Sequence, residues 1–147
     1  MPRQTAFDRA GNGAGVAGEA AQVASDVVNP DVELWDTSSV VRMDGMFQNN
    51  KVADPDVSGW DTSNVTMMKE TFHGALTFNN GNEQAFKWRT DNVKSMAAMF
   101  RNAGSFNCEM NNDGTYWKTD NVTNMIQLFQ NTITDDYGNI LVSDYNQ

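Results

Sequence analysis

Four copies of one short repeat constrain this chain more than any other feature of its sequence. Four tryptophans align the repeats and are separated by 25, 28 and 29 residues. In every repeat a Thr follows the Trp by two residues, a Val by five, a Met by eight and a Phe by twelve. The columns are Trp35, Trp60, Trp88 and Trp117; Thr37, Thr62, Thr90 and Thr119; Val40, Val65, Val93 and Val122; Met43, Met68, Met96 and Met125; and Phe47, Phe72, Phe100 and Phe129. Because one unit of this length cannot bury its apolar face alone, we expect the repeats to stack, with the Trp, Val, Met and Phe columns as the structural core.

The spacing inside the repeat predicts a strand followed by a short helix. Val, Met, the residue before the Phe, and the Phe recur at i, i+3, i+6 and i+7, which is one face of an amphipathic helix. Polar pairs such as Asp91-Asn92 precede the Val as N-caps, and Asn49 and its equivalents lie where the helix would stop. Upstream, Trp60 and Thr62 alternate with polar or small residues, as in a strand. We therefore predict an α/β fold, a short leucine-rich-repeat-like solenoid with parallel strands each followed by a short helix.

The flanking segments are expected to cap the stack. Residues 1–31 are rich in Ala and Gly and form an N-terminal arm, with a cap helix predicted over residues 16–28. Residues 32–135 hold the four-repeat solenoid. Residues 136–147 include Ile140-Leu141-Val142 and are predicted to form a C-terminal capping edge strand. Exposed ends of stacked repeats need such caps for solubility.

Composition excludes several classes of partner. The net charge is −9, with 10 Lys and Arg against 19 Asp and Glu, which argues against nucleic acid or anionic lipid as a partner. The single cysteine, Cys108, permits no intramolecular disulfide and no thiolate metal site. The first 15 residues contain Arg3 and Arg9 but no apolar segment of a signal peptide, and no run of 18 apolar residues predicts a membrane span.

Two repeats carry a family resemblance. Trp60-Asp61-Thr62-Ser63-Asn64-Val65-Thr66, followed by Met68 and Phe72, and residues 117–129 with Asp120-Asn121-Val122-Thr123-Asn124-Met125, resemble the BspA-like leucine-rich-repeat family, whose repeat reads W-D-T-S-N-V-T-x-M-x-x-M-F. The similarity covers residues 32–135. It implies a solenoid fold and surface-exposed, adhesive or host-contacting proteins without known catalysis, and similar repeats also occur in viral proteins. The third and fourth repeats depart from the pattern, because they begin Trp88-Arg89 and Trp117-Lys118.

No motif predicts a catalytic, cofactor-binding or metal-binding residue. Residues 13–18 fit G-x-G-x-x-G, but no strand precedes them as dinucleotide binding requires. His73 is the only histidine and has no evident nucleophile partner, and Cys108 has no activating pair. Asp54 and Asp56 are hard-cation ligands by type, but they lack the spacing of a calcium loop. We expect a flexible arm, a surface histidine and turn carboxylates.

Two surface features are of interest for recognition. Asn64 and Asn121 begin N-glycosylation sequons, although their position in the repeat favours helix capping. Val41, Met67 and Ile126 are apolar residues outside the core columns, at places where other repeats carry polar residues. Large apolar residues out of phase with the core are candidates for a protein interface, so we name these three as a possible interface, the alternative being the scattered apolar residues that are normal on a monomer surface.

These features predict a non-catalytic structural or interaction subunit of an external assembly, such as a virus particle, in which it would serve as a decoration, fibre or appendage protein contacting the host surface. The resemblance is to surface-display proteins, yet the sequence shows no export signal and no disulfides. The expected partners are other subunits, bound through the N-terminal arm, and a host-surface protein or glycan. The expected location is a virion or other external assembly. The alternative is an adhesin-like module that binds a protein or glycan on a cell surface and is itself located there.

Overall fold

The computed structural model describes residues 4–5, 32–33, 35–83, 85–108, 110 and 115–130. The helix predicted over 16–28 and the strand predicted within 136–147 lie outside these residues. The named elements are β1 (Gln4–Thr5), β2 (Trp35–Asp36) and α2 (Asn80–Glu83). β1 and β2 pair in parallel, with Gln4 opposite Trp35 and Thr5 opposite Asp36.

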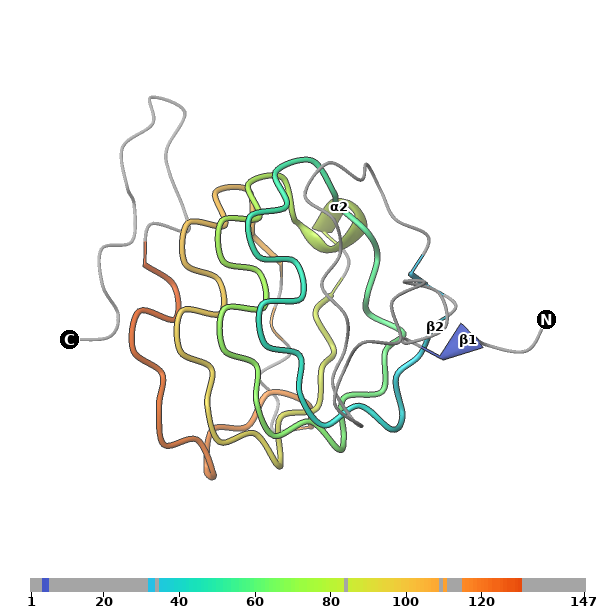
Figure 1. Ribbon diagram of the computed structural model, residues 1–147, viewed down its shortest axis with the longest axis vertical. Coiled ribbons are helices and arrows are strands. Elements are labelled where there is room, and N and C mark those ends of the chain that lie inside the picture. The colour runs from blue at the N-terminus through green and yellow to red at the C-terminus, as the bar shows by residue number, and fades with distance from the viewer. Residues whose placement is uncertain are drawn as a thin grey trace.

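The described chain winds into four stacked coils (Figure 1). We number them from their tryptophans: residues 35–59, 60–87, 88–116 and 117–130. Isolated parallel bridges join equivalent residues of successive coils, from Arg42 to Met67, from Met67 to Ser95 and from Ser95 to Asn124. β1 and β2 lie at the first-coil end, and the fourth coil forms the other end of the described stack (Figure 1).

The predicted α/β leucine-rich-repeat-like solenoid is wrong, because none of the described repeats contains the strand and helix expected of it. Each predicted helix is instead a turn segment of consecutive turns, as in Met43–Met46 and Phe47–Asn50, each closed by a hydrogen bond from its fourth N–H to its first carbonyl. We define the turn segments as residues 43–50, 68–75, 96–103 and 125–130. The third residue of these turns has a positive φ, as type II turns require. These residues are Gly45 (63°), Asn49 (59°), Glu70 (57°), Gly74 (70°), Ala98 (52°), Asn102 (57°) and Gln127 (58°).

The turn segments exchange helical hydrogen bonds for bonds between coils. In an α-helix each N–H bonds the carbonyl four residues back. Here every second N–H of the first turn segment, from Met43 to Asn49, reaches a carbonyl of the second coil, from Met67 to His73, at 2.7–2.9 Å. The second coil bonds the third in the same way, and the third bonds the fourth. A left-handed residue at every fourth position turns these N–H groups along the stack and prevents a helix from forming.

Aromatic ladders fill the interior of the stack. Neighbouring rings of Trp35, Trp60 and Trp88 stack with centroids 6.0 and 5.8 Å apart. The Phe column from Phe47 to Phe129 stacks at 5.3, 5.4 and 5.5 Å. The Trp, Val, Met and Phe columns of the first three coils are at most 4% exposed. Their equivalents in the fourth coil, Trp117, Val122, Met125 and Phe129, are only partly buried.

Candidate interaction surface

Two columns of polar side chains tie the coils together. Thr37, Thr62 and Thr90 donate through Oγ1 to carbonyls of the following coil at 3.0, 2.9 and 2.7 Å. In the opposite direction, the side-chain amides of Asn64, Asn92 and Asn121 donate to carbonyls of the preceding coil at 2.8, 2.8 and 2.7 Å. The prediction that these asparagines cap helices is therefore wrong. The same bonds engage the amide nitrogens of both sequon asparagines, Asn64 and Asn121.

In the third and fourth repeats, Arg89 and Lys118 replace the Asp that follows Trp in the first two repeats, and both cations pair with one carboxylate. Asp61 in the second coil accepts hydrogen bonds from the N–H and hydroxyl of Ser63, and these bonds lower the pKa of Asp61. In the third coil the acid lies two positions later, at Asp91. It contacts Arg89 at 3.0 Å and Lys118 of the fourth coil at 2.9 Å. Hydrogen bonds from these two cations lower the pKa of Asp91 to about 2. The exchange thus adds a charged contact between coils.

The turn carboxylates Asp54 and Asp56 are engaged within the protein. Asp54 Oδ1 accepts from the N–H groups of Asn79 and Gly81, at 2.6 and 3.0 Å, where α2 begins. Asp56 accepts from the N–H and the hydroxyl of Ser58. Asp54 thus holds the loop of the second coil against the first, whereas Asp56 stabilises a turn within the first coil.

His73 lies in a polar column with Gln48, Arg101 and Gln130, all partly buried. In this column Gln48 reaches diagonally to Glu70 of the next coil at 3.0 Å, and Arg101 reaches Gln127 at 3.1 Å. The position that would serve His73 is Ala98, which has no polar side chain, and His73 Nδ1 is buried without a hydrogen-bond partner. Burial lowers the pKa of His73, and the nearby Arg101 adds to this while Glu70 opposes it.

The structure does not gather the three predicted interface residues into one patch. Val41 in the first coil is 40% exposed, and Met67 in the second coil is partly exposed. These two are near neighbours, because Thr66 N–H donates to Val41 C=O and Met67 pairs with Arg42. Ile126 is 59% exposed and lies in the fourth coil. Val41 and Ile126 therefore mark opposite ends of the described stack.

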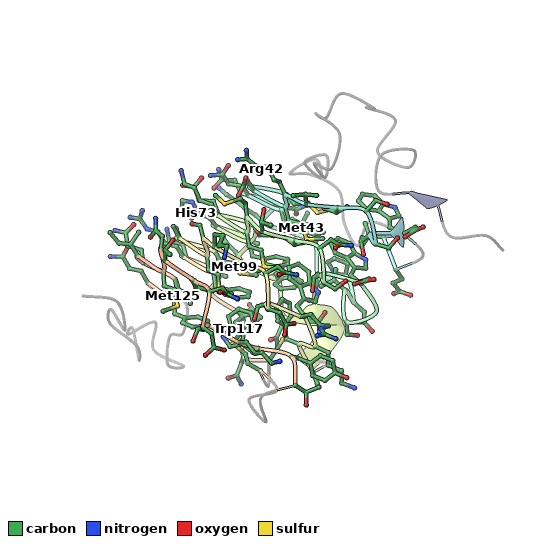
Figure 2. The ribbon with its side chains drawn as sticks, turned by 90° about the horizontal axis from the view of Figure 1, so that it is seen from below. Arg42, Met43, His73, Met99, Trp117 and Met125 are labelled. Atoms are coloured by element: carbon green, nitrogen blue, oxygen red, sulfur yellow. The ribbon has the colours of Figure 1, made fainter. Side chains whose placement is uncertain are left out.

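At the fourth coil the hydrogen-bond ladder of the described residues ends in a row of backbone donors. By the pattern of the other coils, the N–H groups of Met125, Gln127 and Phe129 point away from the third coil. No carbonyl among the described residues accepts from them. Figure 2 labels the buried Met43 and Met99, and it labels Met125 and Trp117 of the fourth coil. This end therefore combines a row of backbone donors with partly exposed apolar side chains, and we call it the donor edge.

The donor edge also lacks charge. Residues 121–134 contain no Asp, Glu, Lys or Arg, whereas the other three turn segments carry Asp44, Lys69 with Glu70, and Arg101. Proteins commonly place charges on unpaired edges to prevent association. An uncharged edge is therefore suited to a polypeptide partner. Sequence reasoning missed this feature, although the uncharged run was visible beside the Ile126 that it did select.

Comparison with known families assigns the chain. Residues 19–140, well over half of the sequence, match the family described as Mycoplasma protein of unknown function, DUF285. The chain belongs to this family. No curated protein and no solved structure matches it. The DUF285 match extends over all four repeats and into both flanking segments.

In the part that the structure describes, no three His, Cys, Asp or Glu side chains gather closely enough to hold a metal ion. Over the same residues no helix has the length and apolar character needed to cross a bilayer. Within this part of the chain, the donor edge is the surface feature that points most directly to a partner.

Proposed function

We propose that this DUF285 protein is a non-catalytic structural and interaction subunit of an external assembly, such as a virus particle, and that it attaches through the donor edge. The single observation that carries the proposal is a row of three N–H groups, at Met125, Gln127 and Phe129, that have no acceptor among the described residues and lie on an uncharged turn segment. Unpaired backbone donors beside partly exposed apolar side chains favour addition of another polypeptide.

The repeat sequence supports an external role. Its resemblance to BspA-like proteins implies surface exposure and adhesion without catalysis. The carboxylates that could serve chemistry are used structurally: Asp54 holds a loop of the second coil, Asp56 bonds within its own turn, and Asp91 bridges two coils. A subunit built in this way contributes a rigid surface rather than a reaction centre.

The test compares where three tagged full-length chains are found in the source organism. Wild type, Ile126→Lys and Leu76→Lys are expressed, and the external fraction of particles and surface material is isolated. Ile126 and Leu76 are both exposed, by 59% and 45%, but only Ile126 lies at the donor edge. We expect wild type and L76K in the external fraction and I126K to be depleted from it several-fold. Absence of wild type from that fraction would contradict the external role, and equal recovery of I126K would contradict the donor edge.

The adhesin-like alternative draws on a different surface. Gln48, His73, Arg101 and Gln130 form a column of hydrogen-bonding side chains along one flank, and amides with guanidinium groups suit the hydroxyls of a glycan. Binding of the full-length chain to a glycan array, lost in Arg101→Ala and kept in I126K, would favour this function over attachment through the donor edge.

A further inference from the structure

The two ends of the stack carry complementary hydrogen-bonding groups. At the fourth coil, the N–H groups of Gln127 and Phe129 have no acceptor among the described residues. At the first coil, no described donor reaches the carbonyls of Asp44 and Met46. Every junction inside the stack joins these same two kinds of group, because each turn segment donates forward and accepts from behind.

The register of such a contact follows from the junctions already present. Glu70 N–H donates to Ala97 C=O and Phe72 N–H donates to Met99 C=O, at 2.9 and 2.8 Å. Glu70 is equivalent to Gln127, and Ala97 is equivalent to Asp44, when the coils are aligned on their tryptophans. By the same alignment, Phe72 is equivalent to Phe129 and Met99 to Met46. The same step therefore pairs Gln127 with Asp44 and Phe129 with Met46.

We propose that the donor edge of one copy docks on the first coil of a second copy, head to tail, in this register. The inference rests on the proposed function and names the partner for it. A normal strand presents both N–H and C=O groups along one edge. A row of donors alone is matched by a row of carbonyls, which is what a coil of this repeat presents on its other side.

Exposed side chains at the rims support the same contact. Val41 and Ile126, 40% and 59% exposed, lie at opposite ends of one copy, and in this register both lie at the junction between copies. β1 pairs with Trp35 and Asp36, so the contact uses a different stretch of the first coil, around Asp44 and Met46. Phe47 is already buried, and the second copy therefore adds backbone hydrogen bonds and rim contacts rather than a new core.

The first experiment measures the solution mass of the full-length chain by sedimentation over a wide range of concentrations. A head-to-tail contact repeats without closing, so the mass of wild type should rise steadily with concentration. Ile126→Asp places a carboxylate at the position that this register aligns with Asp44 of the second copy, so like-charge repulsion should keep it monomeric, whereas Leu76→Asp should associate like wild type. A wild type that is monomeric throughout, or a closed dimer unaffected by Ile126→Asp, would overturn the proposal.

A second experiment tests the register with disulfides. Val41 and Thr123 each lie six residues after their Trp and are both exposed, so the proposed contact places them side by side. Val41→Cys and Thr123→Cys are made separately on a Cys108→Ser background, in which the serine hydroxyl replaces the thiol that contacts Asn79. Oxidation should give a dimer when the two variants are mixed, and much less with either alone or when Leu76→Cys replaces V41C.

The two proposals fail in distinguishable ways. If the chain does not self-associate but wild type is recovered externally and I126K is not, the donor edge binds a different polypeptide, and only the second-copy inference is wrong. If the chain self-associates in the expected register but is absent from the external fraction, the contact stands and the proposed function fails.

Discussion

Lys118 Nζ lies 2.9 Å from Oδ1 of Asp91 in the preceding coil, while Arg89 of Asp91's own coil contacts Oδ2 of the same carboxylate. Arg89 and Asp91 stand where the first two coils have Asp and Ser, and there the acid accepts a hydrogen bond from the N–H of the Ser two residues later. The change from Trp-Asp to Trp-Arg and Trp-Lys thus keeps a hydrogen-bonded carboxylate, at Asp91, and adds an ion pair between the third and fourth coils.

The ion pairs of Asp91 predict that the free energy of unfolding depends on pH in the acid range. The pKa of Asp91 is lowered from 3.8 to about 2 in the folded chain, so its contribution is present above about pH 4 and is lost as the pH falls through 2. Because the group is on the surface, Asp91→Asn should lower the free energy of unfolding at pH 6 by no more than about 1 kcal/mol. Urea unfolding at pH 6, 4 and 2 should show the difference from wild type shrinking, with Asp120→Asn as the control. A difference that grows with acid would contradict the ion pair.

A second prediction concerns the left-handed turn residues. Gly74 has φ of 70°, and a Cβ there would lie 2.6 Å from Asn49 Oδ1 of the neighbouring coil. Gly74→Ala should therefore destabilise the protein by about 1–3 kcal/mol through strain and crowding. Gly59→Ala is the matched control, because nothing lies within 4 Å of its added Cβ. Thermal unfolding of both variants decides the matter, and equal melting temperatures would mean that the turn geometry is not as described.

A third prediction compares two phenylalanines of one ladder. Phe72 stacks between Phe47 and Phe100 and is fully buried, whereas Phe129 stacks on Phe100 and is only partly buried. Phe72→Ala should cost about 3–5 kcal/mol, and Phe129→Ala clearly less. Denaturant titration measures both values at protein concentrations where the chain is monomeric. An equal cost would indicate that the fourth coil is as well covered as the second.

A fourth prediction uses the only histidine. Burial lowers the pKa of His73, so the folded state favours its neutral form. That contribution is present above the unfolded pKa of 6.5 and is lost as the pH falls through the lower folded value. Wild type should therefore lose more thermal stability between pH 7.5 and pH 5 than His73→Gln, whose new residue matches Gln48 and Gln130 of the same column. Parallel pH profiles for the two proteins would refute the assignment.

The sequence indicates which residues share a column but not how the backbone runs between them. Repeats that bury one face against their copies must keep Trp, Val, Met and Phe in register, and that constraint is written in the spacing. A helix and a series of four-residue turns both bring Met68, Thr71 and Phe72 to one side. Apolar periodicity therefore could not distinguish them.

The residue types in the turn segments indicate the consecutive turns at only some positions. Gly45 and Asn49, four residues apart, both tolerate positive φ and were the visible sign of consecutive turns. Glu70, Ala98 and Gln127 adopt the same conformation without any such preference, because the bonds between coils impose it on them. Packing and hydrogen bonding along the stack override local propensity at these positions.

The donor edge was harder to predict from the sequence than the turn segments were. Exposure of Ile126 follows from its phase in the repeat, but the backbone donors beside it depend on the direction of the ladder. That direction is a property of the turn geometry and appears only once the coils are stacked. The lack of a hydrogen-bond partner for His73 Nδ1 likewise cannot be predicted until Ala98 is known to lie at the diagonal position.

The ladder runs in one direction through every junction, from the N–H groups of one turn segment to the carbonyls of the next. Each internal coil therefore meets its two neighbours through the same pair of surfaces. Duplication of the second coil in the gene would create a new junction with contacts that already exist, without altering the first or the fourth coil. The number of coils can therefore change during evolution by whole repeats. Selection on the length of the stack is then separable from selection on what its two ends bind.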